Sequence, residues 1–222
     1  MCGRFDRHSE LEVFAELIEG LVLDDKNSCE PSYNITPSQK AVTVALSATG
    51  ERKMAPLEWG LVPGWVSKTG LQRPINARSE TMFSKPMFKH AANKRRCLIL
   101  CDGFYEWGKT DTGKQPYYFR RDDGKPFVMG GLWESNRRLT DQSIYSFCAV
   151  TKQASQGLSA VHHRMPLILD SDGINQWLNP EKNETEIDAL VGTVDGAGIG
   201  YHAVSSLVNS PANNSPECFE PL

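Results

Sequence analysis

The chain has 222 residues, enough to bury a substantial core in one domain or in two small ones, and we expect a single domain spanning residues 1–222. Its formal net charge of −3 argues against non-specific wrapping of nucleic acid, so any DNA contact must come from a local basic patch. No apolar run approaches the ~18 residues of a membrane span, and no basic segment followed by an apolar stretch indicates a secretory signal, so we expect a cytoplasmic protein with no membrane partner.

The first predicted element is a helix near the N-terminus. Ser9-Glu10-Leu11-Glu12 matches a capping box with Ser9 as the N-cap, and apolar residues then recur at helical spacing until Gly20. Residues 21–40 are polar and rich in turn-forming residues. Two strands and a loop that contains two Gly and one Pro are predicted next: Ala41–Leu46, a strand toward Trp59, and residues 60–65.

The rest of the chain is dominated by predicted strands. They lie at about residues 97–107, 115–121, 126–134, 144–151 and 199–206. Helices are predicted at residues 83–93, 171–178 and 184–191. The tail from Asn209 is rich in Asn, Ser and Pro, and we expect it to be extended. Strands with segregated helices indicate the α+β class.

The six cysteines, at positions 2, 29, 97, 101, 148 and 218, form no Cys-x-x-Cys motif. Cys97 and Cys101 are predicted to share a strand, which would separate them by about 13 Å, whereas a disulfide needs Cα atoms within about 7 Å. We therefore expect reduced thiols. His162-His163 lacks the spacing of known zinc ligand sets, so we expect no metal and no other cofactor.

The first candidate for chemistry is Cys2. Methionine aminopeptidases remove Met1 when the next side chain is small, which would leave an amine and a thiol on one residue. Such a 1,2-aminothiol condenses with an aldehyde to an imine, on which the thiol closes to a five-membered thiazolidine. An α-amine has a pKa of about 7.8, against ~10.4 for Lys, so roughly a third of it is free base at pH 7.5. Taken alone, a cysteine at position 2 is more often incidental.

Glu106 is the second candidate. Period-2 alternation in the strand predicted at 97–107 places it on the same face as three large apolar residues, Leu98, Leu100 and Phe104. A carboxylate on that face is either buried and perturbed or at the mouth of a pocket. The alternative is a strand-end residue in water, aided by a bulge at Gly103. The pattern leaves both open.

Asn76 and His162 are polar residues with common structural explanations. Asn76 opens the stretch Asn-Ala-Arg-Ser-Glu after a loop, and a helix or turn cap is the commoner role for such an asparagine. His162 is followed by His163 and Arg164. A histidine is usually a surface or hydrogen-bonded structural residue, and this cluster raises the odds of function only modestly.

These stretches together resemble the SOS-response-associated peptidase (SRAP) family of abasic-site processing proteins. Six motifs occur in the family's order: Met1-Cys2-Gly3-Arg4, Tyr33-Asn34-Ile35-Thr36-Pro37, Trp59-Gly60-Leu61-Val62-Pro63-Gly64-Trp65, Asn76-Ala77-Arg78-Ser79-Glu80-Thr81, Asp102-Gly103-Phe104-Tyr105-Glu106-Trp107 and His162-His163-Arg164-Met165-Pro166. The tail from Val204 is also similar. The chain departs from the family at Ile35-Thr36, where Val-Ala is common, and at Cys218-Phe219, where aliphatic residues are usual.

The resemblance implies a monomeric sensor of abasic sites in single-stranded DNA, associated with the nucleoid when bound. Its α+β fold would have mixed and antiparallel sheets curled into a pseudo-barrel with peripheral helices. An abasic sugar opens to a C1′ aldehyde, which Cys2 would capture as nucleophile. Asn76 would hold Cys2 and the sugar, and Glu106 and His162 would move protons. The family is also linked to autocatalytic removal of Met1 and to abasic-site lyase activity by β-elimination.

We expect arginines and aromatic residues to hold this DNA. The guanidinium candidates for phosphate binding are Arg4, Arg78 and Arg164. Trp65 would stack beside the site, and Pro37 and Trp107 would wedge against flanking bases. Core packing is the alternative for each aromatic residue. Lys94-Arg95-Arg96 would extend the basic track or, as the commoner case, form a solvated turn.

Three competing functions remain open. N-terminal-nucleophile amidotransferases also begin Met-Cys-Gly and use the α-amine as base to the thiol, but the Glu106 and His162 stretches have no role there. A non-catalytic module that reads modified bases would tolerate loss of Cys2. A cysteine peptidase acting on other proteins is the weakest alternative, because nothing indicates a peptide-binding cleft.

Overall fold

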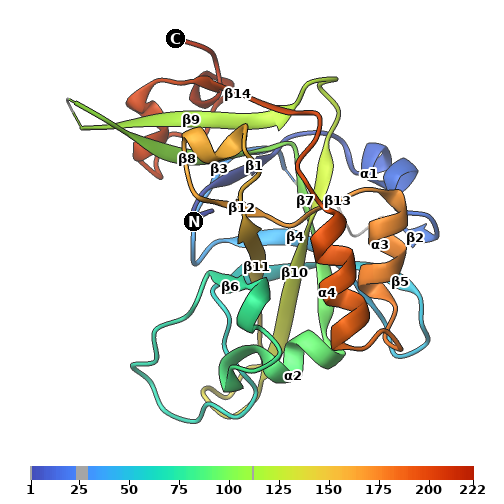
Figure 1. Cartoon of the computed structure of the whole chain (residues 1–222). Coiled ribbons are helices and arrows are strands. Elements are labelled where there is room, and N and C mark those ends of the chain that lie inside the picture. Colours follow the sequence, from blue (N-terminus) through green and yellow to red (C-terminus); the bar gives the residue numbers. More distant parts are fainter. Residues whose placement is uncertain (1, 24–29, 112) are drawn as a thin grey trace.

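The computed structural model describes residues 2–23, 30–111 and 113–222, and its strands form two sheets (Figure 1). The first sheet contains, in spatial order, β14 (Ile199–Ala203), β9 (Gly113–Arg121), β8 (Gly103–Thr110), β1 (Phe5–Arg7) and β3 (Ser32–Ile35). The second contains β12 (Arg164–Pro166), β11 (Ile144–Gln153), β10 (Phe127–Asn136), β7 (Arg96–Cys101), β4 (Lys40–Leu46), β5 (Arg52–Trp59) and β2 (Leu21–Val22). Two short strands add to it, β13 (Ile168–Leu169) beside β10 and β6 (Asn76–Arg78) beside β11.

The second sheet closes on itself. Strands β11, β10, β7, β4 and β5 are hydrogen-bonded in that order, and a parallel pairing of β5 with β11, with Trp59 opposite Phe147, completes the circuit. This arrangement confirms the expected strand-dominated α+β pseudo-barrel. Because the closing pairing is short, it is a ring of hydrogen bonds rather than a true barrel.

Four α-helices among the described residues contribute to one core cluster. They are α1 (Leu11–Leu17), α2 (Pro86–Lys94), α3 (Ser171–Leu178) and α4 (Glu184–Thr193). In Figure 1, α1, α3 and α4 lie on the right and α2 lies at the bottom. The predicted helices at 83–93, 171–178 and 184–191 are confirmed with small shifts at their ends. None of the helices in the described part of the chain is long and apolar enough to cross a membrane.

Alternation along β7 separates two apolar cores. Leu98 and Leu100 pack in a cluster that includes residues of all four helices. Ile99 lies in a second cluster, between the two sheets, together with Cys2 and Phe104. The N-terminal cysteine is therefore part of the apolar layer that joins the sheets.

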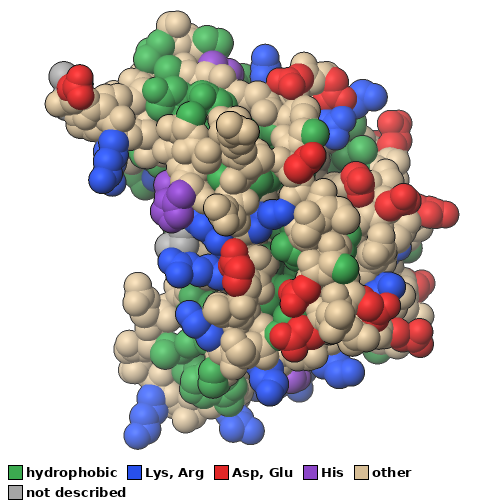
Figure 2. Space-filling view, viewed as in Figure 1, with side chains coloured by type: hydrophobic (Ala, Val, Ile, Leu, Met, Phe, Trp, Pro, Cys, Tyr) green, Lys and Arg blue, Asp and Glu red, His purple; other side chains and the backbone are tan. Residues whose placement is uncertain are grey.

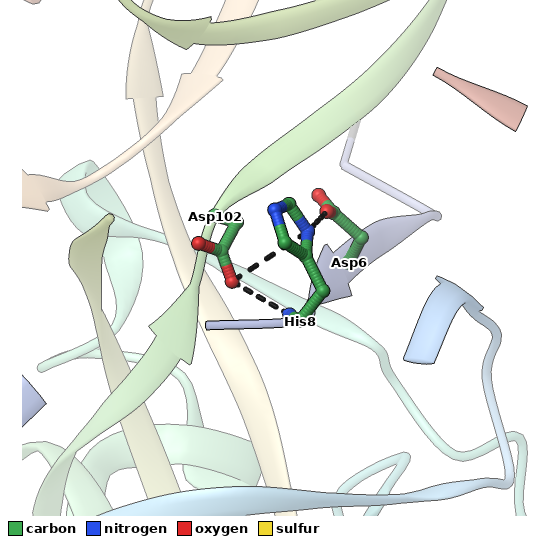
Figure 3. Close-up of side chains that lie close together, drawn as sticks. All are labelled: Asp6, His8 and Asp102. Atoms are coloured by element: carbon green, nitrogen blue, oxygen red, sulfur yellow. Dashed lines mark hydrogen bonds and ion pairs between the residues drawn. The ribbon is translucent and has the colours of Figure 1, made fainter. Parts of the chain in front are cut away.

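The chain passes from one sheet to the other at Asp102, which Figure 3 shows beside His8. Asp102 is buried, and its carboxylate accepts hydrogen bonds from the backbone N–H groups of His8 (2.7 Å) and Ser9 (2.9 Å) and from the Ser9 hydroxyl. The strand predicted at 97–107 is therefore wrong as one element. It is two strands, β7 and β8, with the corner bonded to the start of the chain.

Two further predictions fail at this corner. Glu106 does not share a face with Leu98 and Leu100, since those residues lie on a strand of the other sheet. Ser9 does not cap α1: the residue before the helix is Glu10, no side chain caps its first N–H groups, and the Ser9 hydroxyl bonds Asp102 instead. A tertiary contact has displaced the local capping pattern.

The buried Asp6 and the partly exposed His8 form a pair next to the same corner (Figure 3). Asp6 Oδ2 lies 2.7 Å from His8 Nδ1 and accepts a hydrogen bond from the Tyr118 hydroxyl at 3.2 Å. The His8 ring stacks on the rings of Tyr33 and Phe219, with centroids 5.6 and 5.2 Å away. Burial raises the pKa of Asp6 to about 7, and the hydrogen bond to Asp6 raises the pKa of His8.

Both shifts make the folded state hold a proton that the unfolded state releases, so the stability they provide is lost as pH rises. We expect the free energy of unfolding, measured in urea, to fall from about pH 4 to about pH 7 as Asp6 titrates, and to fall further above about pH 6.5 through His8. Asp6→Asn should flatten this dependence. Asp123→Asn is the control, since Arg121 and neighbouring groups lower the pKa of Asp123 and its titration lies at acid pH. An equally steep fall in Asp6→Asn would show that the pair is not responsible.

The remaining differences concern short elements and the tail. Strands β1 and β3 were not predicted, because each is only three or four residues long and depends on pairing with distant strands. The tail from Asn209 is not extended. It folds through 3-10 segments, η3 (Ser206–Asn209) and η4 (Pro216–Cys218), because the buried Asn34 side chain donates to three of its backbone carbonyls.

Candidate active site

The two sheets bring four predicted residues together. Cys2 precedes β1 and Glu106 lies in the neighbouring strand β8 of the first sheet. Asn76 begins β6 and His162 precedes β12, and both of these strands pair with β11 of the second sheet. The candidate site thus lies at the junction of the sheets, and each sheet supplies two of its residues.

Cys2 is 1% exposed and is held through its backbone. The Asn76 side-chain NH₂ donates to the Cys2 carbonyl at 2.8 Å, so Asn76 starts a strand and holds Cys2 rather than capping a helix. The Asn76 Oδ1 is buried with no hydrogen-bond partner among the described residues. It is therefore available to an N–H group placed beside Cys2.

The thiol of Cys2 is not a thiolate at neutral pH. Burial, followed by the nearby Glu106 carboxylate, raises its pKa to about 12. The thiolate is the reactive form of cysteine. A reaction through this thiol therefore requires a base that removes its proton, and Glu106 is the charged group close enough to perturb it.

Glu106 and His162 form the acid–base part of the site. Glu106 is 4% exposed, and its Oε1 lies 3.9 Å from Nδ1 of His162. The same Nδ1 lies 3.0 Å from the backbone nitrogen of Arg164 and 3.2 Å from its carbonyl oxygen, so the backbone of Arg164 orients the ring. A buried carboxylate beside an imidazole can hold and pass on a proton.

His163 packs against this pair from the solvent side. Its ring stacks on His162 with centroids 4.4 Å apart. His163 is exposed, and its pKa is lowered, first by the neighbouring His162 and also by Arg164 and Arg78. The stacked rings therefore disfavour two simultaneous positive charges.

The three predicted phosphate-binding arginines differ in their surroundings. Arg78 is exposed and has no hydrogen-bond or ion-pair partner among the described residues. Arg4 donates to Asn34 Oδ1 at 2.6 Å. Arg164 is 9% exposed and forms two hydrogen bonds with Glu80, at 2.6 and 2.9 Å. Arg78 is thus available to a ligand, whereas Arg164 is held inside the protein.

The predicted aromatic contacts also differ. Trp65 is 54% exposed, and no other tryptophan of the chain is classed as exposed. Trp107 is partly buried, donates to Asn209 Oδ1 at 2.7 Å and packs against the Arg4 guanidinium. Pro37 is partly buried in the turn after β3. The alternative for each of these residues was packing in the core, and the exposure of Trp65 excludes it for that residue.

The five described cysteines are free and buried, as expected; Met1 and Cys29 lie outside the described residues. The segment Lys94-Arg95-Arg96 was expected to be a solvated turn. Arg96 is instead buried and donates to the carbonyls of Ala92 and Trp177. That expectation was wrong for Arg96. The role of Glu80 in fixing Arg164 was missed, since no local pattern pairs residues so far apart.

The family model for SOS response associated peptidase (SRAP) matches residues 1–211. The chain belongs to the SRAP family. Among its SRAP relatives, "Abasic site processing protein YoqW" of Bacillus subtilis (strain 168) is 34% identical over 226 residues, covering 99% of both chains. "Abasic site processing protein YedK" of Escherichia coli (strain K12) is 34% identical over 229 residues, covering all of both.

Two solved structures have a similar fold. A phage-related protein from Bordetella bronchiseptica superposes with a TM-score of 0.73 at 27% identity, covering 91% of this chain and 94% of that one. A protein from Bacteroides thetaiotaomicron superposes with a TM-score of 0.76 at 23% identity, covering 97% and 91%. At that identity the second likeness concerns the fold alone.

Proposed function

We propose that this SRAP protein processes abasic sites in single-stranded DNA by covalent capture. After removal of Met1, Cys2 forms a thiazolidine with the C1′ aldehyde of the ring-opened sugar. The observation that carries the proposal is the set of contacts around Cys2: Asn76 bonded to its carbonyl, and Glu106 beside its thiol with His162 next to Glu106. The relatives named for abasic-site processing support the substrate.

The high pKa of the thiol sets the order of steps. The α-amine attacks C1′ first, and the resulting carbinolamine loses water when His162 or Glu106 protonates its hydroxyl. Glu106 then takes the proton of the thiol as sulfur bonds to the imine carbon, and the imine nitrogen gains a proton. The product is a neutral five-membered ring, with one water released and no other reactant consumed.

Two secondary activities follow from the same groups. An imine at C1′ makes the C2′ protons more acidic, so a base can remove one and expel the 3′ phosphate, which is abasic-site lyase chemistry. The buried thiol with its neighbouring base is also a nucleophile for autocatalytic hydrolysis of the Met1–Cys2 bond. The SRAP description as a peptidase supports this second activity.

The surface around the site suits a DNA strand. Figure 2 shows Lys, Arg and His side chains gathered around a hollow on one side of the molecule, with most acidic side chains on the other. The protein therefore has a local basic patch, although its net charge is −3. Arg78 is the exposed phosphate contact we propose and Trp65 the stacking platform, while Arg4 and Arg164 shape the site from inside.

The proposal predicts a strong preference for unpaired DNA, because capture needs a sugar turned out of the strand and bases free to stack. We expect the crosslink yield with a single-stranded abasic oligonucleotide to exceed that with a paired duplex by at least about tenfold. Uracil-glycosylase-treated strands, with and without a complement, are compared on a denaturing gel. Equal yields would contradict the proposal, and an untreated uracil strand is the control.

The alternatives give different results in the same assays. An N-terminal-nucleophile amidotransferase would release ammonia from glutamine and form no DNA adduct. A module that reads modified bases would bind undamaged DNA equally well and retain binding after loss of Cys2. A peptidase acting on other proteins would cleave unrelated substrates. None of these uses the Asn76–Cys2–Glu106 contacts together.

A further inference from the structure

A groove of about 640 Å³ lies beside Trp65, outside the residues assigned to the reaction. We call it the arginine groove; its lining includes Trp65, His90, Arg95, Glu134, Arg137 and Arg138. It combines an exposed aromatic ring with three guanidinium groups. Stacking surfaces beside phosphate-binding charges are typical of single-stranded nucleic-acid sites.

The charge of the groove is positive at its rim. On its floor, Glu134 is 4% exposed and is ion-paired with Arg95 and, at 2.7 Å, with His90 Nδ1. The negative charge of Glu134 is therefore balanced by the Arg95 guanidinium. Arg137 and Arg138 are exposed, and neither side chain has an ion-pair or hydrogen-bond partner in the described part of the chain. Two unpaired guanidinium groups face solvent at one edge.

A buried asparagine fixes both walls of the groove relative to each other. Asn136 is fully buried, and its NH₂ group donates to the carbonyls of Pro63 (2.7 Å) and Val66 (2.8 Å), on either side of Trp65. Its Oδ1 accepts from the backbone N–H groups of Arg138 and Leu139, each at 2.9 Å. One side chain thus joins the loop of residues 60–75 that carries Trp65, which we call the tryptophan loop, to the turn that carries Arg137 and Arg138.

Close packing strengthens this connection. A Cβ on Gly64 would lie 3.0 Å from the backbone oxygen of Ser135, so the tryptophan loop rests directly on the end of β10. The same loop continues to Asn76 of the candidate active site. The arginine groove is therefore preformed, and residues 66–75 connect its tryptophan to the residue that holds Cys2.

We propose that the arginine groove holds the DNA strand that flanks the abasic nucleotide on one side. Arg137 and Arg138 bind two successive phosphates, and Trp65 stacks on the base between them and the site. This inference rests on the proposed function, since it takes the substrate to be single-stranded DNA. The exposed Trp65 ring and its continuity with Asn76 favour a nucleic-acid strand over an acidic peptide, the other ligand that arginines would attract.

The test measures binding to strands that carry an unreactive tetrahydrofuran abasic analogue. A short strand is compared with strands extended by about four nucleotides on the 5′ or the 3′ side. For the wild type, one extension should tighten binding and steepen the slope of log K against log salt by about 1.4, for two phosphates at ~0.7 each. Arg137→Ala/Arg138→Ala should remove that gain and leave the opposite extension unaffected.

Arg120→Ala/Arg121→Ala, an adjacent arginine pair on β9 of the other sheet, is the matched control and should retain the gain. Fluorescence gives a second measurement: the favoured extension should quench the wild type, and the quenching should be absent in Trp65→Phe. Retention of the gain in the Arg137/Arg138 variant overturns the inference, as does an equal loss of affinity for all three strands.

Two further outcomes keep the proposals distinguishable. If an Asp- and Glu-rich peptide binds through Arg137 and Arg138 while every DNA strand binds normally, the groove belongs to a protein partner and the inference is wrong. Crosslinking of a reactive abasic strand by the wild type is measured in parallel. Its absence, with the flank-dependent gain intact, would refute covalent capture and leave the arginine groove as a DNA site.

Discussion

Replacing Cys2 with alanine is expected to abolish the heat-stable DNA adduct while preserving a DNA adduct that borohydride can trap. Alanine is small, so Met1 should still be removed by aminopeptidase and leave a free α-amine. That amine can form the imine, which reductant fixes, and β-elimination from the imine should nick the strand. Without the thiol the thiazolidine cannot close. The measurement is a denaturing gel of abasic-DNA reactions with and without borohydride.

The companion variant keeps Cys2 but adds one uncleaved residue before it. Its nitrogen becomes an amide, which is not nucleophilic, so both the stable adduct and the trappable imine should disappear. Affinity for a tetrahydrofuran strand serves as the control for folding and should persist. A heat-stable adduct from this protein would mean that the thiol acts alone, and the aminothiol mechanism would have to be given up.

Glu106→Gln is expected to slow crosslinking by about 10²–10⁴-fold, the usual contribution of general acid–base catalysis. Glutamine keeps the shape of the side chain in its buried position but cannot accept the proton of the Cys2 thiol, whose pKa of about 12 makes it dependent on a base. Single-turnover rates at saturating abasic DNA measure the effect. Affinity for the unreactive strand should change little.

The matched control for this substitution is Glu58→Gln. Glu58 is a partly exposed glutamate that is ion-paired with Arg73 and makes none of the contacts described around Cys2. It should crosslink at the wild-type rate. Wild-type kinetics in Glu106→Gln would show that this carboxylate only supports the structure.

Local sequence patterns predicted elements that depend on local contacts. Helix α3 is bounded as predicted, because Asp170 caps it through the N–H of Gly173 and its apolar residues recur at helical spacing. The corner at Asp102 was missed, since the apolar residues on both sides of Asp102-Gly103 read together as one strand. What divides it is a carboxylate bound by His8 and Ser9, together with the Tyr118 ring lying against Gly103, where a Cβ would be 2.2 Å from that ring.

The candidate site also depends on contacts between distant segments, which local sequence patterns do not show. The alternation that singled out Glu106 counted Leu98 and Leu100 as its neighbours, and they belong to the other sheet. Glu106 is buried all the same, because it lies on the same face of β8 as Phe104, whose side chain packs between the sheets. The association of Cys2, Asn76, Glu106 and His162 came from motif resemblance. Pairing rules could not supply it, since these residues lie on four strands or their ends and meet only after both sheets form.

The position of β1 between β3 and β8 bears on when the N-terminus can be trimmed during biosynthesis. The strand β1, which follows Cys2, cannot be enclosed until residues 103–110 of β8 have been translated. Until then a ribosome-associated aminopeptidase meets an accessible, extended N-terminus. After folding, Cys2 is 1% exposed and sealed between the sheets. Under the mechanism proposed above, a nascent chain that folds before trimming would have to release Met1 with its own thiol, and the rate of translation past β8 would set the share of protein matured by each route.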